Sequence, residues 1–96
     1  MKAVMLIFAP ALEDEVMQAI KISGVKKYSK IPYMHGAGGH SDPHLDTQVW
    51  PGSNEALLIM TDEGTKTKLL KAAADIKQSS PEEGMKAFVW TVEEEV

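Results

Sequence analysis

The residues with the clearest chemical potential lie in one stretch, MHGAGGHSDPHLDTQVWPG, which covers residues 34–52. This stretch holds all three histidines of the chain, His35, His40 and His44, and Asp46 follows them closely. Imidazole nitrogens with one carboxylate suit Zn²⁺, Cu²⁺, Ni²⁺ or Co²⁺. The spacing H-x4-H-x3-H-x-D therefore suggests a metal site in a loop that orders around the ion. The alternative is a loop whose histidines simply face solvent.

The same stretch is rich in glycine, and the segment HGAGGH offers a second kind of site. Backbone N–H groups around Gly36, Gly38 and Gly39 could form a nest that cradles a phosphate. Neither the lysine nor the helix of a P-loop follows these glycines. The simpler explanation is that these glycines only allow the loop to turn and bind no phosphate.

Charge and composition exclude several classes of function. The chain carries a net charge of −4 and has ten lysines but no arginine. Nucleic-acid phosphates require a basic surface, so we expect no nucleic-acid partner. The chain has no cysteine and no apolar run near the roughly 18 residues of a membrane helix, which favours a cytoplasmic protein. It also has no nucleophile in a recognisable catalytic motif, so we expect no enzyme.

Hydrophobic patterning predicts the elements that must position this stretch. We expect, in order, a strand over 2–8, a helix over 10–23, a strand over 25–34, a strand over 55–61, a helix over 63–78 and a strand over 86–92. Pro32 limits the second strand to an edge of the sheet, and Pro51-Gly52 predicts a turn. The second helix should be capped by Thr61 or Asp62. Its inner side should carry Leu69, Leu70, Ala73 and Ile76.

The order βαββαβ in a single domain of 96 residues predicts an α+β fold of the ferredoxin-like type. Such a fold has a four-stranded antiparallel sheet with both helices on one face, and a long loop here joins strands 2 and 3. The strands are apolar on both sides, although the helices can cover only one side. We therefore expect a partner subunit to cover the other face.

With this element order and a glycine-rich arm between strands 2 and 3, the chain resembles the PII signalling family and its PII-like relatives. The local matches are LEDEVMQAIKISGVKKY around the first helix, GAGGH at the start of the arm, and MKAFVW at the last strand. The resemblance implies a homotrimer with effector sites in the clefts between subunits. It also implies that the arm, about residues 34–53, is a T-loop that docks on and regulates a transporter or an enzyme.

The resemblance assigns roles to individual residues. Lys86 matches the lysine that contacts nucleotide phosphates, and Gly36, Gly38 and Gly39 fall at the base of the T-loop. The segment before Lys86 is reduced to SSPEEGM, whose two glutamates repel phosphates, and the family's terminal arginines are absent. These departures argue against a typical ATP and 2-oxoglutarate site. They favour a different effector, for which a divalent metal bound by His35, His40, His44 and Asp46 is one candidate.

Two other classes share this order of elements. An ACT-like module would bind a small ligand between dimer-related helices, but it needs a glycine-bearing turn where this chain has APAL. A small dimeric α+β barrel enzyme would place a histidine and other polar side chains over the open side of the sheet. The apolar strands VMLIF, ALLIM and AFVW argue against it.

Overall fold

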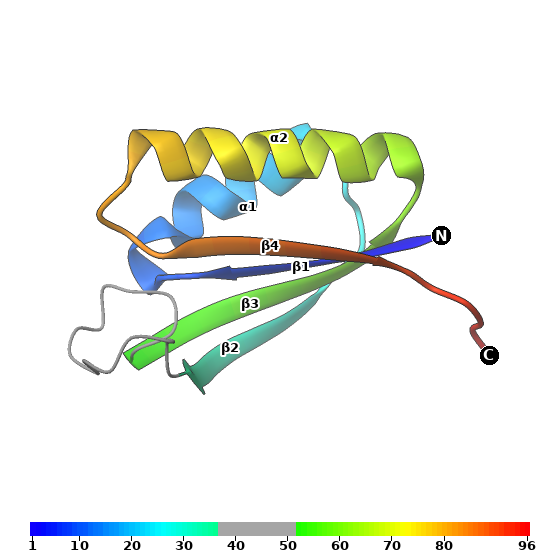
Figure 1. Cartoon of the computed structure of the whole chain (residues 1–96), viewed down its shortest axis with the longest axis horizontal. Helices are drawn as coiled ribbons and strands as arrows, with labels where there is room; N and C mark the ends of the chain where they lie inside the picture. Colours follow the sequence, from blue (N-terminus) through cyan, green and yellow to red (C-terminus); the bar gives the residue numbers. More distant parts are fainter. Residues whose placement is uncertain (37–51) are drawn as a thin grey trace.

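The computed structural model describes residues 1–36 and 52–96, and in these the predicted order of elements is confirmed. The elements are β1 (Lys2–Phe8), the short 3-10 helix η1 (Pro10–Leu12), α1 (Glu13–Ile22), β2 (Ser29–Gly36), β3 (Gly52–Thr61), α2 (Glu63–Ser79) and β4 (Met85–Thr91). Figure 1 shows both helices on one side of the sheet, with the two chain termini near the same end of it.

In the described part of the chain the strands form one antiparallel sheet in the order β2-β3-β1-β4. The central strands are therefore β1 and β3, which are the most apolar segments of the sequence. Val4 pairs with Ile59 on one side and with Val89 on the other, so the three strands are in register. This is the ferredoxin-like α+β arrangement that the sequence predicts.

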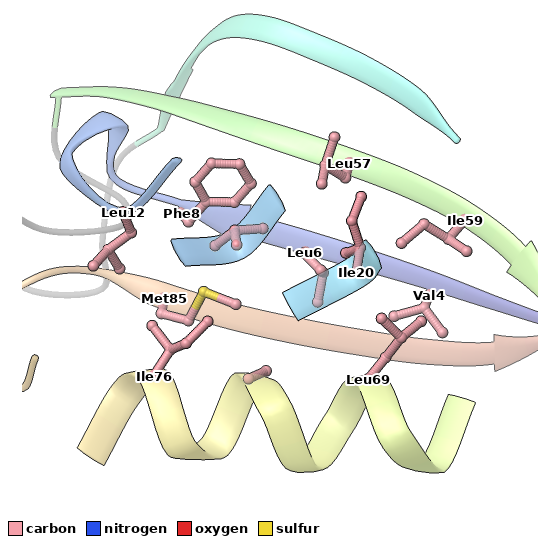
Figure 2. Close-up of a cluster of buried hydrophobic side chains, with 12 residues drawn as sticks. Val4, Leu6, Phe8, Leu12, Ile20, Leu57, Ile59, Leu69, Ile76 and Met85 are labelled. Atoms are coloured by element: carbon pink, nitrogen blue, oxygen red, sulfur yellow. The ribbon is translucent and has the colours of Figure 1, made fainter. Parts of the chain in front are cut away.

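The hydrophobic core lies between the helices and the covered face of the sheet, where alternate strand residues point (Figure 2). The buried side chains that form it are Val4, Leu6, Phe8, Leu12, Val16, Ile20, Leu57, Ile59, Leu69, Ala73, Ile76 and Met85. Phe8, Leu12 and Leu57 are among its largest fully buried members. Of the residues predicted on the inner side of α2, Leu69, Ala73 and Ile76 are buried, and Leu70 is only half-buried.

The ends of both helices have the expected chemistry. The Asp62 side chain caps α2 by accepting a hydrogen bond from the backbone N–H of Thr65 at 2.7 Å. After α1 the chain turns at Gly24, whose φ of 90° lies in the left-handed region that favours glycine. The Asp62 cap places the start of α2 at the predicted residue, and the turn at Gly24 ends α1 within one residue of the predicted position.

The boundaries of β2 and β3 differ from the sequence prediction. The second strand was expected over 25–34, but β2 covers Ser29–Gly36 because its limits depend on where β3 supplies partners. The predicted turn at Pro51-Gly52 is wrong for Gly52, which opens β3 and pairs with Gly36. Pro51 lies outside the described residues. The hairpin ladder therefore extends further towards the arm than apolar patterning indicates.

The sheet surface opposite the helices, which we call the open face, is apolar along most of its length. One row across it consists of Met60, Ala3 and Trp90, and the next consists of Leu58, Met5 and Phe88. Met60, Phe88 and Trp90 are 48%, 43% and 45% exposed, which is high for side chains of this size. Large apolar patches of this kind mark interaction surfaces.

Candidate functional site

The arm leaves the body of the protein through a short stem, which we define as residues 34–36 of β2 and 52–54 of β3. Its pairs are Met34 with Asn54, His35 with Ser53 and Gly36 with Gly52. The last residue of β1 to pair with β3 is Phe8, opposite Glu55. The stem therefore projects beyond β1 as a two-stranded ribbon, at the left-hand end of the sheet in Figure 1.

Only part of the predicted histidine site belongs to the described chain. His35 lies in the stem, exposed, and its ring packs edge-on against Tyr33 with 4.8 Å between ring centroids. His40, His44 and Asp46 lie outside the described residues. Within residues 1–36 and 52–96, no three potential ligand side chains lie close enough together to hold a metal ion. The metal site stays a prediction.

The predicted phosphate contacts lie at the same end of the sheet but on different strands. Gly36 ends β2, and Gly38 and Gly39 lie outside the described residues. Lys86 is exposed on the open face of β4, where it pairs with Ile7. Two strands lie between β4 and β2, which makes three spacings of about 4.8 Å, and the register places Gly36 four residues beyond Lys86 along the strand direction. Together these place Lys86 roughly 20 Å from Gly36. One phosphate cannot contact both within a single chain.

The turn before Lys86 is acidic. It covers residues 80–84 and is closed by a hydrogen bond of 3.0 Å from the Glu83 backbone N–H to the Ser80 carbonyl. The Gly84 carbonyl accepts a second bond of 3.0 Å from the Ala9 N–H, which fixes the turn against the end of β1. Glu82 is exposed and Glu83 half-buried. An anion approaching Lys86 therefore passes close to negative charge.

The structure also joins three charged residues that the sequence did not connect. Lys30 of β2 donates a short hydrogen bond to Glu13 at the start of α1. The Lys30 Nζ atom lies 3.6 Å from Oε1 of Glu55 in β3. Glu55 is only 8% exposed, which is unusual for a carboxylate. These three side chains, the Glu13–Lys30–Glu55 cluster, tie together three elements beside the arm stem.

The two carboxyl groups of the cluster have opposite pKa shifts. The hydrogen bond from Lys30 lowers the pKa of Glu13 below its ordinary value. Burial raises the pKa of Glu55, and the negative charge of Glu13 adds to that increase, against the opposing effect of Lys30. The hydrogen bond to Glu13 in turn raises the pKa of Lys30. A proton entering the cluster therefore goes to Glu55 rather than to Glu13.

From the sequence alone, Glu13 belongs to a solvated charge run and Glu55 begins an apolar strand. A signal for Glu55 was nonetheless present, because it alternates with Leu57 and Ile59, which face the core. The partner Lys30 could not be identified from the sequence. Its contact depends on the pairing of β2 with β3, in which Lys30 lies opposite Leu57.

A groove of about 450 Å³ runs between α1 and α2 on the outside of the molecule. Ala19, Ile22, Ala72 and Ile76 provide its apolar lining, and Glu15 and Lys68 are among its charged residues. No predicted site residue that the structure describes lines this groove. The candidate site is therefore at the stem and the open face, away from the helices.

A family model for the nitrogen regulatory protein P-II matches the chain over residues 1–96. The chain belongs to the P-II family. This family is one of signalling and regulatory proteins, as the resemblance indicated, and membership decides against the ACT-like and barrel-enzyme alternatives. A comparison with curated protein sequences gives no match.

Solved structures of PII-like proteins share the fold. A PII-like signaling protein from Thermus thermophilus has 23% identity and a TM-score of 0.68, with 95% of this chain and 85% of that chain covered. CPII, a nitrogen regulatory PII-like protein from Thiomonas intermedia K12 bound to ADP, AMP and bicarbonate, has 16% identity and a TM-score of 0.72. That match covers 95% of this chain and 88% of CPII. A second CPII structure, bound to ADP and bicarbonate, has 19% identity, a TM-score of 0.69 and coverage of 93% and 82%.

Among the residues that the structure describes, neither helix has the length and apolar composition needed to cross a bilayer.

Proposed function

We propose that this P-II family member is a regulatory protein without catalysis of its own, acting in the cytoplasm as a homotrimer. An effector binds in clefts between its subunits, and the arm, about residues 34–53, docks on a transporter or an enzyme. The observation that carries this proposal is the apolar open face, which connects the arm stem at one edge of the sheet with Lys86 at the other.

The open face supports assembly because it holds large apolar side chains in contact with water. Ile31, Met60, Phe88 and Trp90 are each at least 38% exposed in one chain. Burying such surface contributes about 25 cal/mol per Å² of apolar area. A symmetric assembly would bury it once in each subunit, and a domain of this size gains substantially from a shared interface.

The separation of the candidate contacts supports a site between subunits. Two strands lie between Lys86 and Gly36 in one chain, so they are too far apart for a single phosphate to contact both. Assembly over the open face would bring the stem of one copy near Lys86 of another. A lysine and backbone N–H groups of Gly36, Gly38 and Gly39 suit a phosphate in a chain without arginine.

Nucleotides are the first effector candidates. The fold neighbour CPII is bound to ADP, AMP and bicarbonate, which supports testing adenine nucleotides together with bicarbonate. The acidic turn at residues 80–84 opposes highly charged phosphates, so we expect ADP or AMP to bind more tightly than ATP.

A divalent metal is the second candidate, supported by the histidine spacing in the arm. His35, His40, His44 and Asp46 would form the site, with Zn²⁺, Cu²⁺, Ni²⁺ or Co²⁺ as the ion. To act as a signal, the ion must bind one conformation of the arm more tightly than the other.

Two measurements on the purified protein test the assembly and the nucleotide site. Light scattering should give the mass of a trimer. Calorimetry with ADP, AMP and ATP, each with and without bicarbonate, should detect binding that Lys86→Met weakens by about tenfold or more, since a charge-assisted hydrogen bond is lost. Lys71→Met, an exposed lysine on α2, should bind as the unmodified protein does. A monomer, or binding that Lys86→Met leaves unchanged, contradicts the proposal.

The metal candidate is tested separately by titrating Zn²⁺, Cu²⁺, Ni²⁺ and Co²⁺. The double variant His40→Ala/His44→Ala should lose the binding, while its trimer mass and nucleotide affinity stay unchanged. If affinity and stoichiometry do not depend on these histidines, the arm is not a metal site.

A further inference from the structure

The weakest point of the β2–β3 ladder lies directly beside the arm stem. Ile31 pairs with Ala56 and Met34 with Asn54, so two residues of β2 oppose a single residue of β3 between these pairs. The two residues are Pro32 and Tyr33, and the single residue is Glu55. Such a bulge leaves the local ladder incomplete, and Pro32 has no N–H to donate. Side-chain contacts can therefore add to the backbone pairing at this position.

The Glu13–Lys30–Glu55 cluster occupies this position. Glu55 lies opposite the bulge, and Lys30 lies just before it on β2. The Lys30 amine bridges the two strands at 3.6 Å from Glu55 and reaches α1 through its hydrogen bond to Glu13. Side-chain contacts thus join β2, β3 and α1 where the backbone ladder is interrupted.

The charges of this cluster do not balance when both carboxyl groups are ionised. Among the described residues, the charged groups that face Glu55 are Glu13 from α1 and Lys30 from β2, and its β1 partner Phe8 carries no charge. One ammonium group then faces two carboxylates, one of them buried, and the net charge of the cluster is −1. Adding a proton to Glu55 makes the cluster neutral and removes the repulsion between the carboxylates.

We propose that Glu55 is the proton-binding element of a lock on the arm stem. With Glu55 protonated, the contacts among α1, β2 and β3 close and hold the stem against the body. With Glu55 ionised, repulsion from Glu13 and the cost of a buried charge loosen the stem. The proton taken up comes from solvent, and Lys30 keeps its proton in both states.

The direction of the pKa shift agrees with this lock. The pKa of Glu55 lies above the ordinary glutamate value of 4.5, because the folded environment disfavours its charge. The stabilisation it provides is therefore complete below the ordinary value and is lost as the pH rises through the raised pKa. By reciprocity, an effector or partner that holds the stem closed must raise the pKa of Glu55 further. Its binding is then accompanied by uptake of a proton by the protein.

The idea that the lock regulates the position of the arm rests on the proposed function. The test of the lock itself does not need an effector. The full-length protein is titrated by carboxyl-detected NMR to follow Glu55. Amide hydrogen exchange of residues 29–36 and 52–57, corrected for the intrinsic pH dependence of exchange, reports opening of the stem. Between the acidic and alkaline limits, the opening equilibrium should rise about tenfold for each pH unit by which the Glu55 pKa differs between closed and open stem.

Two variants and a matched control complete the experiment. Glu55→Gln, a neutral isostere, should keep the stem closed at every pH and abolish the pH dependence of opening. Lys30→Met leaves two facing carboxyl groups without the ammonium bridge, so it should raise the Glu55 pKa, move the pH-dependent opening to higher pH and increase opening at the alkaline limit. Lys71→Met, which breaks an exposed pair with Asp75 3.6 Å away on α2, should change nothing.

Two results would contradict the lock. In the first, the corrected hydrogen exchange of the stem amides does not depend on pH. In the second, it depends on pH and the same dependence is seen in Glu55→Gln. The nucleotide and metal titrations would be unaffected by either result. Conversely, a protein that binds no effector can still show the pH-dependent stem, so failure of the lock and failure of the proposed function are distinguishable.

Discussion

The two faces of the sheet are built from the same strands but differ in how far their side chains are buried. On the covered face, Leu57 and Ile59 of β3 are no more than 1% exposed beneath the helices. On the open face, Met60 of the same strand is 48% exposed. Because successive strand residues alternate in direction, neighbouring positions in the sequence belong to different functions. One face stabilises the single chain, and the other is available for assembly.

The comparison also shows why apolar content alone does not measure stability. Val4 and Leu6 are buried in each chain, whereas Trp90 stays 45% exposed and would be fully buried only if another subunit covered the open face. If the open face is an interface between subunits, the stability of this protein depends on its concentration, since association favours the folded state by mass action.

The sharpest test compares Leu57→Ala with Leu58→Ala, adjacent positions on opposite faces. Leu57→Ala leaves a cavity in the core and should reduce the free energy of unfolding by about 2–5 kcal/mol. Leu58→Ala should cost less, and its cost should grow with protein concentration as the open face is buried. Denaturant unfolding at several concentrations measures both. Equal, concentration-independent losses would contradict the division between the faces.

A charge on the open face should have the next largest effect. Trp90→Asp places a carboxylate on the apolar surface and should dissociate the trimer at micromolar concentration while the secondary structure persists. Ile22→Asp is the matched control, because Ile22 is 77% exposed on α1, outside both the sheet faces. Light scattering and circular dichroism report the two properties. Trimers retained in Trp90→Asp would show that the open face is not the interface.

A helix cap should have a smaller effect that is independent of assembly. Asp62→Ala removes the acceptor for the Thr65 N–H and should lower Tm by about 5 °C. That hydrogen bond lowers the pKa of Asp62, so its stabilisation is present above the unfolded pKa and is lost as the pH falls through the folded one. Thermal melts from pH 7 to pH 2 should therefore converge with those of Asp62→Ala in acid. Asp75→Ala, also on α2, is the control and should not change the pH dependence.

The smallest effect is expected on the outer helix surface, which belongs to neither sheet face. Lys71→Met breaks an exposed pair, and such pairs contribute little to stability. Unfolding free energy and trimer mass should both match those of the unmodified protein within error. A measurable change in mass would reveal that the helices take part in assembly.

Much of the fold was predictable because it depends on local patterns. The strand over 2–8 is confirmed residue for residue, and the α2 cap at Asp62 follows from side-chain chemistry next to a periodic run. The apolar character of both strand faces correctly indicated an uncovered surface. These features need only the neighbouring residues in the chain.

The remaining features depend on pairing between distant segments. The limits of β2 follow from β3, and the bulge opposite Glu55 exists only in their register. The contact of Lys30 with Glu13 joins residues 17 positions apart on different elements. For the candidate site, the sequence predicts roles for Lys86 and His35 but could not give the strand register that sets the distance from Lys86 to the stem.

The central position of β1 has a consequence for how the chain is made. Within this domain β1 is synthesised before the other strands, and it pairs with β3 at Gly52–Thr61 and with β4 at Met85–Thr91, so its partners leave the ribosome well after it. Until β3 and β4 have been synthesised, the apolar strand β1 has no strand to pair with. Pairings this distant in sequence slow folding and expose the nascent chain to aggregation. We therefore expect the sheet to close only when β4 has left the ribosome and can pair with β1.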